Sequence, residues 1–177
     1  FKLFSPFRKD LYEERLKFLN FFERKPSDFS LYGKGWDKPD PFNLKEKIFG
    51  YKKYKSYKGE IRGNNKLKVI SDFKFCISIE NASAEGYITE KIFDCFKAGC
   101  VPIYYGAPNI EKYIPKETFV DFRDFQNYNE LIKFLTSMRK KRYSKYIASA
   151  RKFLNSRKTQ KKWFEEAFLK LFLSAIS

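Results

Sequence analysis

Apolar residues recur at helical spacing in several stretches of the chain. Apolar positions repeated about every 3.6 residues are the pattern of an amphipathic helix. The pattern predicts helices over residues 8–24, 89–98, 127–138, 139–162 and 160–176. The last of these carries an apolar stripe, which we expect to dock on the rest of the protein. The stripe is formed by Trp163, Phe164, Ala167, Phe168, Leu171 and Phe172.

Strand-like runs alternate with these helices in the middle of the chain. Residues 73–80, 100–106 and 118–122 are rich in aromatic and β-branched residues, which favour strands. A loop at 81–88 joins the first of these runs to the helix over 89–98, where Thr89 can cap the helix and Gly99 can end it. Strand, helix and strand in this order predict an α/β fold with a parallel sheet and flanking helices.

The remaining stretches are less regular. Residues 30–36 predict a short strand that runs into a glycine turn, and residues 108–113 predict a short helix. Residues 38–68 are rich in lysine and predict a short helix with a long loop. The length suits one domain, with a core at 70–135 and basic helices at 136–177.

Charge is unevenly distributed along the chain. The 37 Lys and Arg residues and 21 Asp and Glu residues give a net charge of +16. Residues 1–70 carry 18 basic and 9 acidic residues (net +9), residues 71–135 carry 7 and 10 (net −3), and residues 136–177 carry 12 and 2 (net +10). Such basicity favours a polyanionic partner: nucleic acid, an anionic membrane surface or a phosphorylated ligand.

Histidine is absent and cysteine is sparse. The sequence contains no His, which excludes a Ser-His-Asp triad, a Cys-His pair and a histidine metal ligand. Cys76, Cys95 and Cys100 form no Cys-x-x-Cys motif, and three cysteines make a poor disulfide framework. We expect buried free thiols in a reducing compartment.

The sequence predicts no segment that targets or spans a membrane. No run approaches the ~18 apolar residues of a membrane span, and charges interrupt the start too early for a signal peptide. The first residues read as the middle of a domain, so we expect a fragment of a longer protein.

One loop followed by a helix suggests a ligand site. Ligands of open α/β sheets bind beyond the carboxyl ends of the strands, where the loop 81–88 lies. The N-terminus of the following helix suits a phosphate, Lys91 could neutralise it, and Glu90 could accept hydrogen bonds from a ribose diol. Together they fit a nucleotide diphosphate held without a metal. The alternative is that Glu90 only complements the helix dipole and Lys91 is only solvated.

A contiguous stretch in the middle of the chain closely resembles the signature of the α-1,3-fucosyltransferases of glycosyltransferase family 10. The stretch is residues 73–115, FKFCISIENASAEGYITEKIFDCFKAGCVPIYYGAPNIEKYIP. The family signature reads approximately F-x-F-x-[IL]-x-[FI]-E-N, a variable stretch, G-Y-[VIT]-T-E-K-I, a helix and [IV]-P-[IV]-Y-[WY]-G. The sequence departs from it at Ile79, where Phe is usual, and at Tyr105, where Trp is frequent. Residues 119–125 also resemble the family.

The resemblance implies a two-lobed GT-B enzyme whose C-terminal, Rossmann-like lobe binds GDP-fucose. It places residues 1–177 in that lobe as a single donor-binding domain, without the N-terminal acceptor lobe. The six donor-binding residues that it implies are Asn81, Gly86, Tyr87, Glu90, Lys91 and Arg8. Lys91 and Arg8 would stabilise the leaving diphosphate. Arg8 stands four residues before Tyr12, as in the family pattern R-x-x-[FY]-Y, and Arg15 is the alternative.

The reaction that the resemblance implies is inverting transfer of L-fucose from GDP-β-L-fucose to the 3-hydroxyl of a glycan that contains GlcNAc or glucose. We expect no metal and no cofactor. The general base should be a carboxylate, because the chain has no histidine. We expect that base in the absent lobe, and Glu80 and Glu85 are the local candidates.

Other interpretations stay open. The chain could be a sugar-nucleotide-binding lobe without catalytic activity. Tyr51, Tyr54 and Tyr57 among lysines could stack on single-stranded nucleic acid, although we expect no nucleic-acid partner. The basic C-terminal third could contact an anionic membrane. The expected location is cytoplasmic, with peripheral membrane contact, in a bacterium, or the Golgi lumen in a eukaryote.

Overall fold

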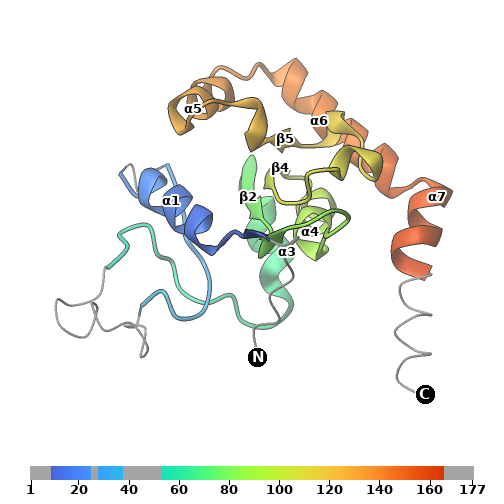
Figure 1. Ribbon diagram of the computed structural model, residues 1–177. Coiled ribbons are helices and arrows are strands. Elements are labelled where there is room, and N and C mark those ends of the chain that lie inside the picture. The colour runs from blue at the N-terminus through green and yellow to red at the C-terminus, as the bar shows by residue number, and fades with distance from the viewer. Residues whose placement is uncertain (1–8, 25–27, 38–52, 166–177) are drawn as a thin grey trace. The chain divides into compact units, whose positions relative to one another are not determined.

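A computed structural model describes residues 9–24, 28–37 and 53–165 of the chain (Figure 1). Its contacts form two compact units. The larger unit comprises Phe1–Leu11 and Ile70–Ser177, and the smaller comprises Tyr12–Val69.

The larger unit is built on a parallel sheet. The strands β2 (Phe75–Ile79), β4 (Val101–Tyr105) and β5 (Val120–Asp121) lie in the order β2-β4-β5. Phe75 pairs with Val101, and Ile103 pairs with Val120. The predicted α/β class with a parallel sheet and flanking helices is therefore confirmed. Each strand is shorter than its predicted run by one residue or more at each end, because the hydrophobic pattern also covers the turns that flank a strand.

Helix α4 (Glu90–Ala98) makes the crossover from β2 to β4. It buries Ile92, Phe93, Cys95 and Phe96. Gly99 ends it in the left-handed conformation, with φ of 73°, and its N–H bonds to the last turn of the helix. A residue with a β-carbon would be strained there, which explains why the helix stops where the sequence predicts.

Two further helices follow β5 in the chain. They are α5 (Tyr128–Thr136), which Asn127 caps through its side chain, and α6 (Lys140–Leu154). Helix α6 lies beside α4 and β4 (Figure 1). One core cluster joins α4, β4, the segment after β4, and α6. Its buried members are Ile92, Phe93, Phe96, Tyr104, Ala107, Ile110, Ile114, Phe119 and Ala150.

The long basic helix expected over 139–162 is interrupted. Helix α6 ends at Leu154, and the hydroxyl of Ser156 caps the short α7 (Arg157–Thr159) by accepting the N–H of Thr159 at 3.2 Å. A π-helical turn, η5 (Gln160–Glu165), follows. Trp163 packs against Phe93, so the first residue of the predicted apolar stripe does dock on the core. The stripe from Phe164 onward lies outside the described side chains.

The first predicted helix begins later than expected. Lys9–Asp10 form a short strand, β1, which pairs antiparallel with β3 (Ala82–Ser83) in the loop after β2. Helix α1 (Tyr12–Phe22) follows in the smaller unit. The pairing joins segments about seventy residues apart, which local periodicity does not reveal.

Short 3₁₀ turns complete the larger unit. They are η2 (Ile110–Lys112), within the short helix predicted over 108–113, η3 (Lys116–Thr118) and η4 (Phe122–Asp124).

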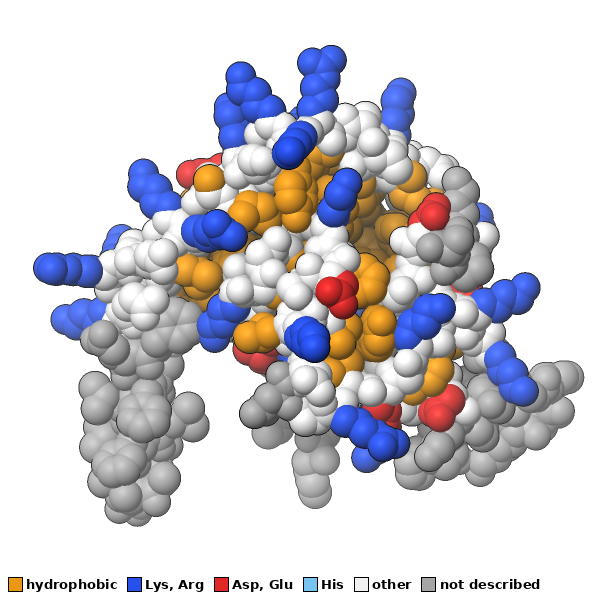
Figure 2. Space-filling model, turned by 180° about the vertical axis from the view of Figure 1, so that it is seen from behind, with side chains coloured by type: hydrophobic (Ala, Val, Ile, Leu, Met, Phe, Trp, Pro, Cys, Tyr) orange, Lys and Arg blue, Asp and Glu red, His pale blue; other side chains and the backbone are white. Residues whose placement is uncertain are grey.

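On the face shown in Figure 2, Lys and Arg side chains project around hydrophobic side chains. Within the described residues, no helix is long and apolar enough to cross a membrane.

In the smaller unit, α1 buries Phe18 and Leu19. An isolated parallel bridge joins Leu31 to Tyr57, in place of the short strand expected over 30–36. Part of the lysine-rich stretch, with Tyr51, lies outside the described residues. It continues with η1 (Gly63–Asn65) and α3 (Lys66–Ser71), the latter running into the larger unit.

The two described tyrosines of the lysine-rich stretch take part in packing. Tyr54 meets Trp36 edge to face, with ring centroids 5.7 Å apart. The hydroxyl of Tyr57 donates a hydrogen bond to the carbonyl of Gly33 at 3.0 Å. Both rings therefore contribute to the stability of the unit, which gives a structural reason for their presence.

Candidate functional site

The carboxyl ends of the parallel strands meet at one edge of the sheet. Glu80 follows β2, Gly106 follows β4, and Asp121 ends β5. This edge is where open α/β sheets bind ligands. The loop 81–88 and the N-terminus of α4 extend from it, as the sequence predicts.

Glu80 is the centre of the polar contacts at this edge. Its side chain is fully buried and accepts three hydrogen bonds. The donors are the N–H of Thr89 at 2.8 Å, the hydroxyl of Thr89 at 2.7 Å and the ammonium of Lys91 at 3.1 Å. A buried carboxylate is tolerated when it is paired and hydrogen-bonded in this way.

Thr89 occupies the N-cap position of α4 but does not cap the helix with its side chain. Its hydroxyl donates to Glu80 and accepts from the ammonium of Lys91 at 3.1 Å. The prediction that Thr89 caps the helix is therefore right about the position and wrong about the side chain. The hydroxyl of Thr89 binds Glu80, at the end of the neighbouring strand, and not the backbone of the helix.

Lys91 is held in place and still reaches the surface. Its ammonium contacts Glu80 and Thr89, and 26% of its side chain is exposed. An ammonium carries three N–H donors, so two contacts leave one donor for a ligand. The arrangement can present a fixed positive charge at the N-terminus of a helix, where an anion is also favoured by the helix dipole.

The other predicted donor residues of this segment precede Lys91 in the chain. Asn81 and Glu90 are exposed, and Tyr87 is half-buried. Gly86 is exposed with φ of 69°, and its N–H donates to the side-chain oxygen of Asn109 at 2.8 Å. The structure thus places Asn81, Gly86, Tyr87, Glu90 and Lys91 on one loop and the helix turn that follows it.

The two predicted arginines lie outside the described part of the larger unit. Arg8 lies outside the described residues. Arg15 lies on α1, in the smaller unit. A second cation for a diphosphate therefore stays a prediction.

Gly106 allows the strand ends to pack closely. A β-carbon on Gly106 would lie 2.5 Å from the Cγ of Glu80 and 2.5 Å from the hydroxyl of Tyr104. The carbonyl of Gly106 accepts a hydrogen bond from the hydroxyl of Ser83 at 3.0 Å. The turn after β4 is therefore fixed against both Glu80 and the loop after β2.

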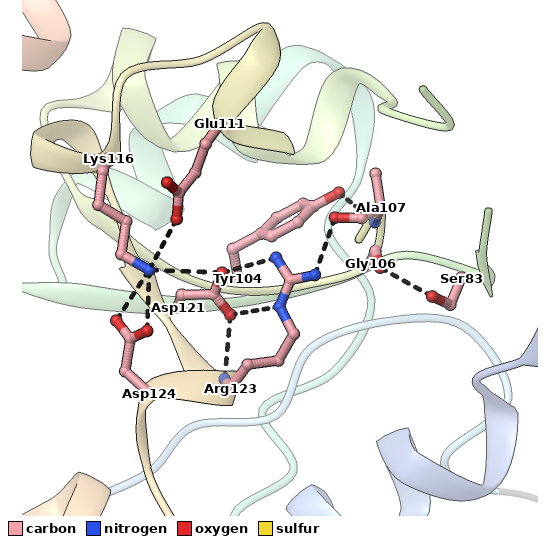
Figure 3. A network of polar contacts seen from close by, with 9 residues as sticks. All are labelled: Ser83, Tyr104, Gly106, Ala107, Glu111, Lys116, Asp121, Arg123 and Asp124. Carbon is pink, nitrogen blue, oxygen red and sulfur yellow. Dashed lines mark hydrogen bonds and ion pairs between the residues drawn. The ribbon is translucent and has the colours of Figure 1, made fainter. Parts of the chain in front are cut away.

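A second polar network lies beyond β4 and β5 (Figure 3). Arg123 binds the buried carboxylate of Asp121 through two nitrogens, at 2.9 and 2.6 Å. These hydrogen bonds to Asp121 raise the pKa of Arg123. Lys116 contacts Asp121 as well, and also Glu111 and Asp124. Burial raises the pKa of Tyr104, which remains a neutral phenol within this network.

Sequence reasoning missed how these networks are connected. Glu80 was expected as a candidate base, whereas the structure shows it as the partner of Lys91 and Thr89. Neither Arg123 nor Asn109 was among the predicted site residues. A carboxylate that directly follows an apolar strand, as Glu80 does, is a signal that could have identified a buried polar anchor.

The three cysteines are free thiols, as expected: Cys95 and Cys100 are buried, and Cys76 is half-buried. The thiol of Cys95 donates to the carbonyl of Lys91 at 3.3 Å. Its hydrogen bond with Cys76, together with burial, raises the pKa of Cys95 well above its usual value. Burial also raises the pKa of Cys100.

No group of three or more His, Cys, Asp or Glu residues in the described part of the chain could hold a metal ion.

Comparison with known sequences identifies relatives. The sequence model "Glycosyltransferase family 10 (fucosyltransferase) C-term" matches residues 12–171. Over 71 residues the chain is 38% identical to "Alpha-(1,3)-fucosyltransferase FucT" of Helicobacter pylori, which covers 40% of this chain and 15% of that protein. Over 95 residues it is 37% identical to "Alpha-(1,3)-fucosyltransferase B" of Drosophila melanogaster, which covers 52% and 21%. The matched regions are thus well under half of these relatives.

Comparison with solved structures finds α1,3-fucosyltransferases among the similar chains. An α1,3-fucosyltransferase crystallised with GDP-fucose shares 24% sequence identity and a TM-score of 0.47, over 77% of this chain and 44% of that chain. The stretch 73–115, which resembles the family signature, contains the ends of β2 and β4. Because the family model matches nearly the whole sequence, the chain belongs to glycosyltransferase family 10, the fucosyltransferases, and corresponds to their C-terminal region.

Proposed function

We propose that this chain is the donor-binding part of a fucosyltransferase that transfers L-fucose from GDP-β-L-fucose, with inversion, to the 3-hydroxyl of a GlcNAc- or glucose-containing glycan. One observation carries the proposal. The ammonium of Lys91 is fixed by a buried carboxylate at the N-terminus of α4, directly after a strand end of a parallel sheet. Family membership supplies the class of the reaction.

In the proposed complex, the diphosphate lies at the N-terminus of α4. The helix end attracts an anion through its dipole and backbone N–H groups. Lys91 adds a charge-assisted hydrogen bond, which is stronger than a neutral one. Because Glu80 and Thr89 already orient the ammonium, the protein loses little side-chain entropy when the phosphate binds.

The remaining donor contacts come from the same segment. Glu90 is exposed in the first turn of α4, and its carboxylate can accept hydrogen bonds from both hydroxyls of a ribose. Asn81, Gly86 and Tyr87 precede it in the loop and are proposed to contact the donor. Arg8 is proposed as the second cation, on the basis of the family pattern.

The chemistry is a displacement at C1 of fucose. The bond between C1 and the β-phosphate oxygen breaks, and the electron pair leaves with GDP. The acceptor hydroxyl bonds to C1 from the opposite face through a transition state that resembles an oxocarbenium ion. Lys91 stabilises the negative charge that develops on the departing diphosphate.

The acceptor proton goes to a general base, which we propose is a carboxylate outside this chain. Glu80 is unsuited to that role. It is fully buried, and its oxygens already accept three hydrogen bonds, whereas a general base must reach the acceptor hydroxyl. Its proposed role is to hold Lys91.

The proposal is tested by calorimetric titration of the chain with GDP and GDP-fucose in the presence of EDTA, with ADP and UDP as controls. We expect GDP and GDP-fucose to bind, to compete with each other, and to bind more tightly than either control. Absence of GDP binding would overturn the proposal. Binding without fucosyl transfer to a lactosamine acceptor would support a donor-binding lobe that needs the rest of the enzyme for catalysis.

A further inference from the structure

The backbone of Ala107 is held on both sides. Its N–H donates to the hydroxyl of Tyr104 at 2.9 Å, and its carbonyl accepts from the guanidinium of Arg123 at 3.1 Å (Figure 3). Ala107 and Tyr104 are fully buried. The turn after β4 therefore has two anchors, of which one comes from a different strand end.

Arg123 is itself oriented by Asp121 at the end of β5. Its Nε donates to one carboxylate oxygen at 2.9 Å and its Nη2 to the other at 2.6 Å. The same carboxylate accepts the backbone N–H of Arg123 at 3.0 Å. Two parallel hydrogen bonds fix the plane of the guanidinium, so its remaining nitrogen points at Ala107 in one orientation.

The turn after β4 also holds the loop that carries the proposed donor residues. The side-chain oxygen of Asn109 accepts the N–H of Gly86 at 2.8 Å. The carbonyl of Gly106 accepts the hydroxyl of Ser83 at 3.0 Å. The segment Gly106–Asn109 thus contacts Arg123 through Ala107, and it contacts the loop 81–88 through Gly106 and Asn109.

We infer that Asp121, Arg123 and Asn109 are positioning residues, which fix the donor loop around Gly86 and Tyr87 through the turn Gly106–Asn109. The inference rests on the proposed function, because it assigns these residues to a GDP-fucose site. None of the three needs to touch the donor. Their effect is to keep the loop in one conformation, so that binding does not have to order it.

The first test needs no ligand. Hydrogen exchange of the Gly86 and Ala107 amides is measured in the wild type, in Arg123→Lys and in Asn109→Ala, with Arg151→Lys on α6 as the matched control. Lysine keeps the charge but cannot reproduce the planar fork. We expect the Gly86 amide to exchange about 3- to 10-fold faster in Arg123→Lys, as for loss of one hydrogen bond. Unchanged exchange at Gly86 in Arg123→Lys would overturn the inference.

The second test is a double-mutant cycle on GDP affinity with the same variants. Arg123 and Asn109 act on one turn, so we expect each single variant to weaken binding about 3- to 10-fold and the double variant to weaken it little further. Additive losses would contradict a shared positioning role. If the wild type bound no GDP, the proposed function would fail, and the exchange measurement alone would decide the inference. Asn109→Ala removes only a half-buried side chain, which keeps the test valid if Arg123→Lys does not fold.

Discussion

Gly106 lies so close to Glu80 that a β-carbon on the glycine would stand 2.5 Å from the Cγ of the buried carboxylate side chain. The residues that follow β2 and β4 can therefore lie this close together only because position 106 has no side chain. The same carboxylate holds Lys91. Packing of the strand ends and orientation of the proposed phosphate-binding ammonium thus both involve the Glu80 side chain.

Gly106→Ala should destabilise the larger unit. The added methyl group would displace Glu80 and the hydroxyl of Tyr104, and overpacking of this kind costs about 1–3 kcal/mol. Urea denaturation measures the change in the free energy of unfolding. Ser144→Ala, on the exposed face of α6, is the control and should stay within about 0.5 kcal/mol of the wild type. Equal stability of the two variants would show that the turn relaxes without cost.

Glu80→Ala should also destabilise the protein. The substitution leaves the N–H and hydroxyl of Thr89 without their acceptor, and an unsatisfied buried donor costs about 1–3 kcal/mol. Glu85→Ala removes an exposed carboxylate from the same loop and is the matched control. If Glu80→Ala had the same urea midpoint of unfolding as Glu85→Ala and the wild type, Glu80 would not be a structural anchor.

The cysteines should differ in their reaction with iodoacetamide. The raised pKa values keep the Cys95 and Cys100 thiols protonated at pH 8.5, whereas an ordinary thiol is about half ionised there. Mass spectrometry should find Cys76 alkylated first in the folded protein and all three at similar rates in urea. Rapid alkylation of Cys95 without denaturant would contradict its burial.

The sheet and its crossover helix were predictable from sequence because their signals are local. Strand β2 is a run of aromatic and β-branched residues, and Gly99 marks the end of α4. The break after Leu154 carried a weaker local signal, the cap at Ser156.

The contacts that shape the site were not predictable in the same way. Glu80 meets Lys91 across eleven residues of sequence, and Arg123 meets Ala107 across sixteen. The β1–β3 pairing spans a longer interval still. Periodicity reports which face of an element is buried, and it does not report which buried polar groups will become partners.

Lys91, held by Glu80 and Thr89, is the residue that we propose to bind the diphosphate of the donor. The most direct measurement is calorimetric titration of GDP, with EDTA present, into the wild type, Lys91→Ala and Lys97→Ala. Lys97 lies in the last turn of the same helix, so its loss removes the same charge away from the site. A charge-assisted hydrogen bond is worth about 1.5–3 kcal/mol, so the account predicts a loss of about 10- to 100-fold in affinity for Lys91→Ala and little change for Lys97→Ala. Equal affinities for Lys91→Ala and the wild type would contradict it.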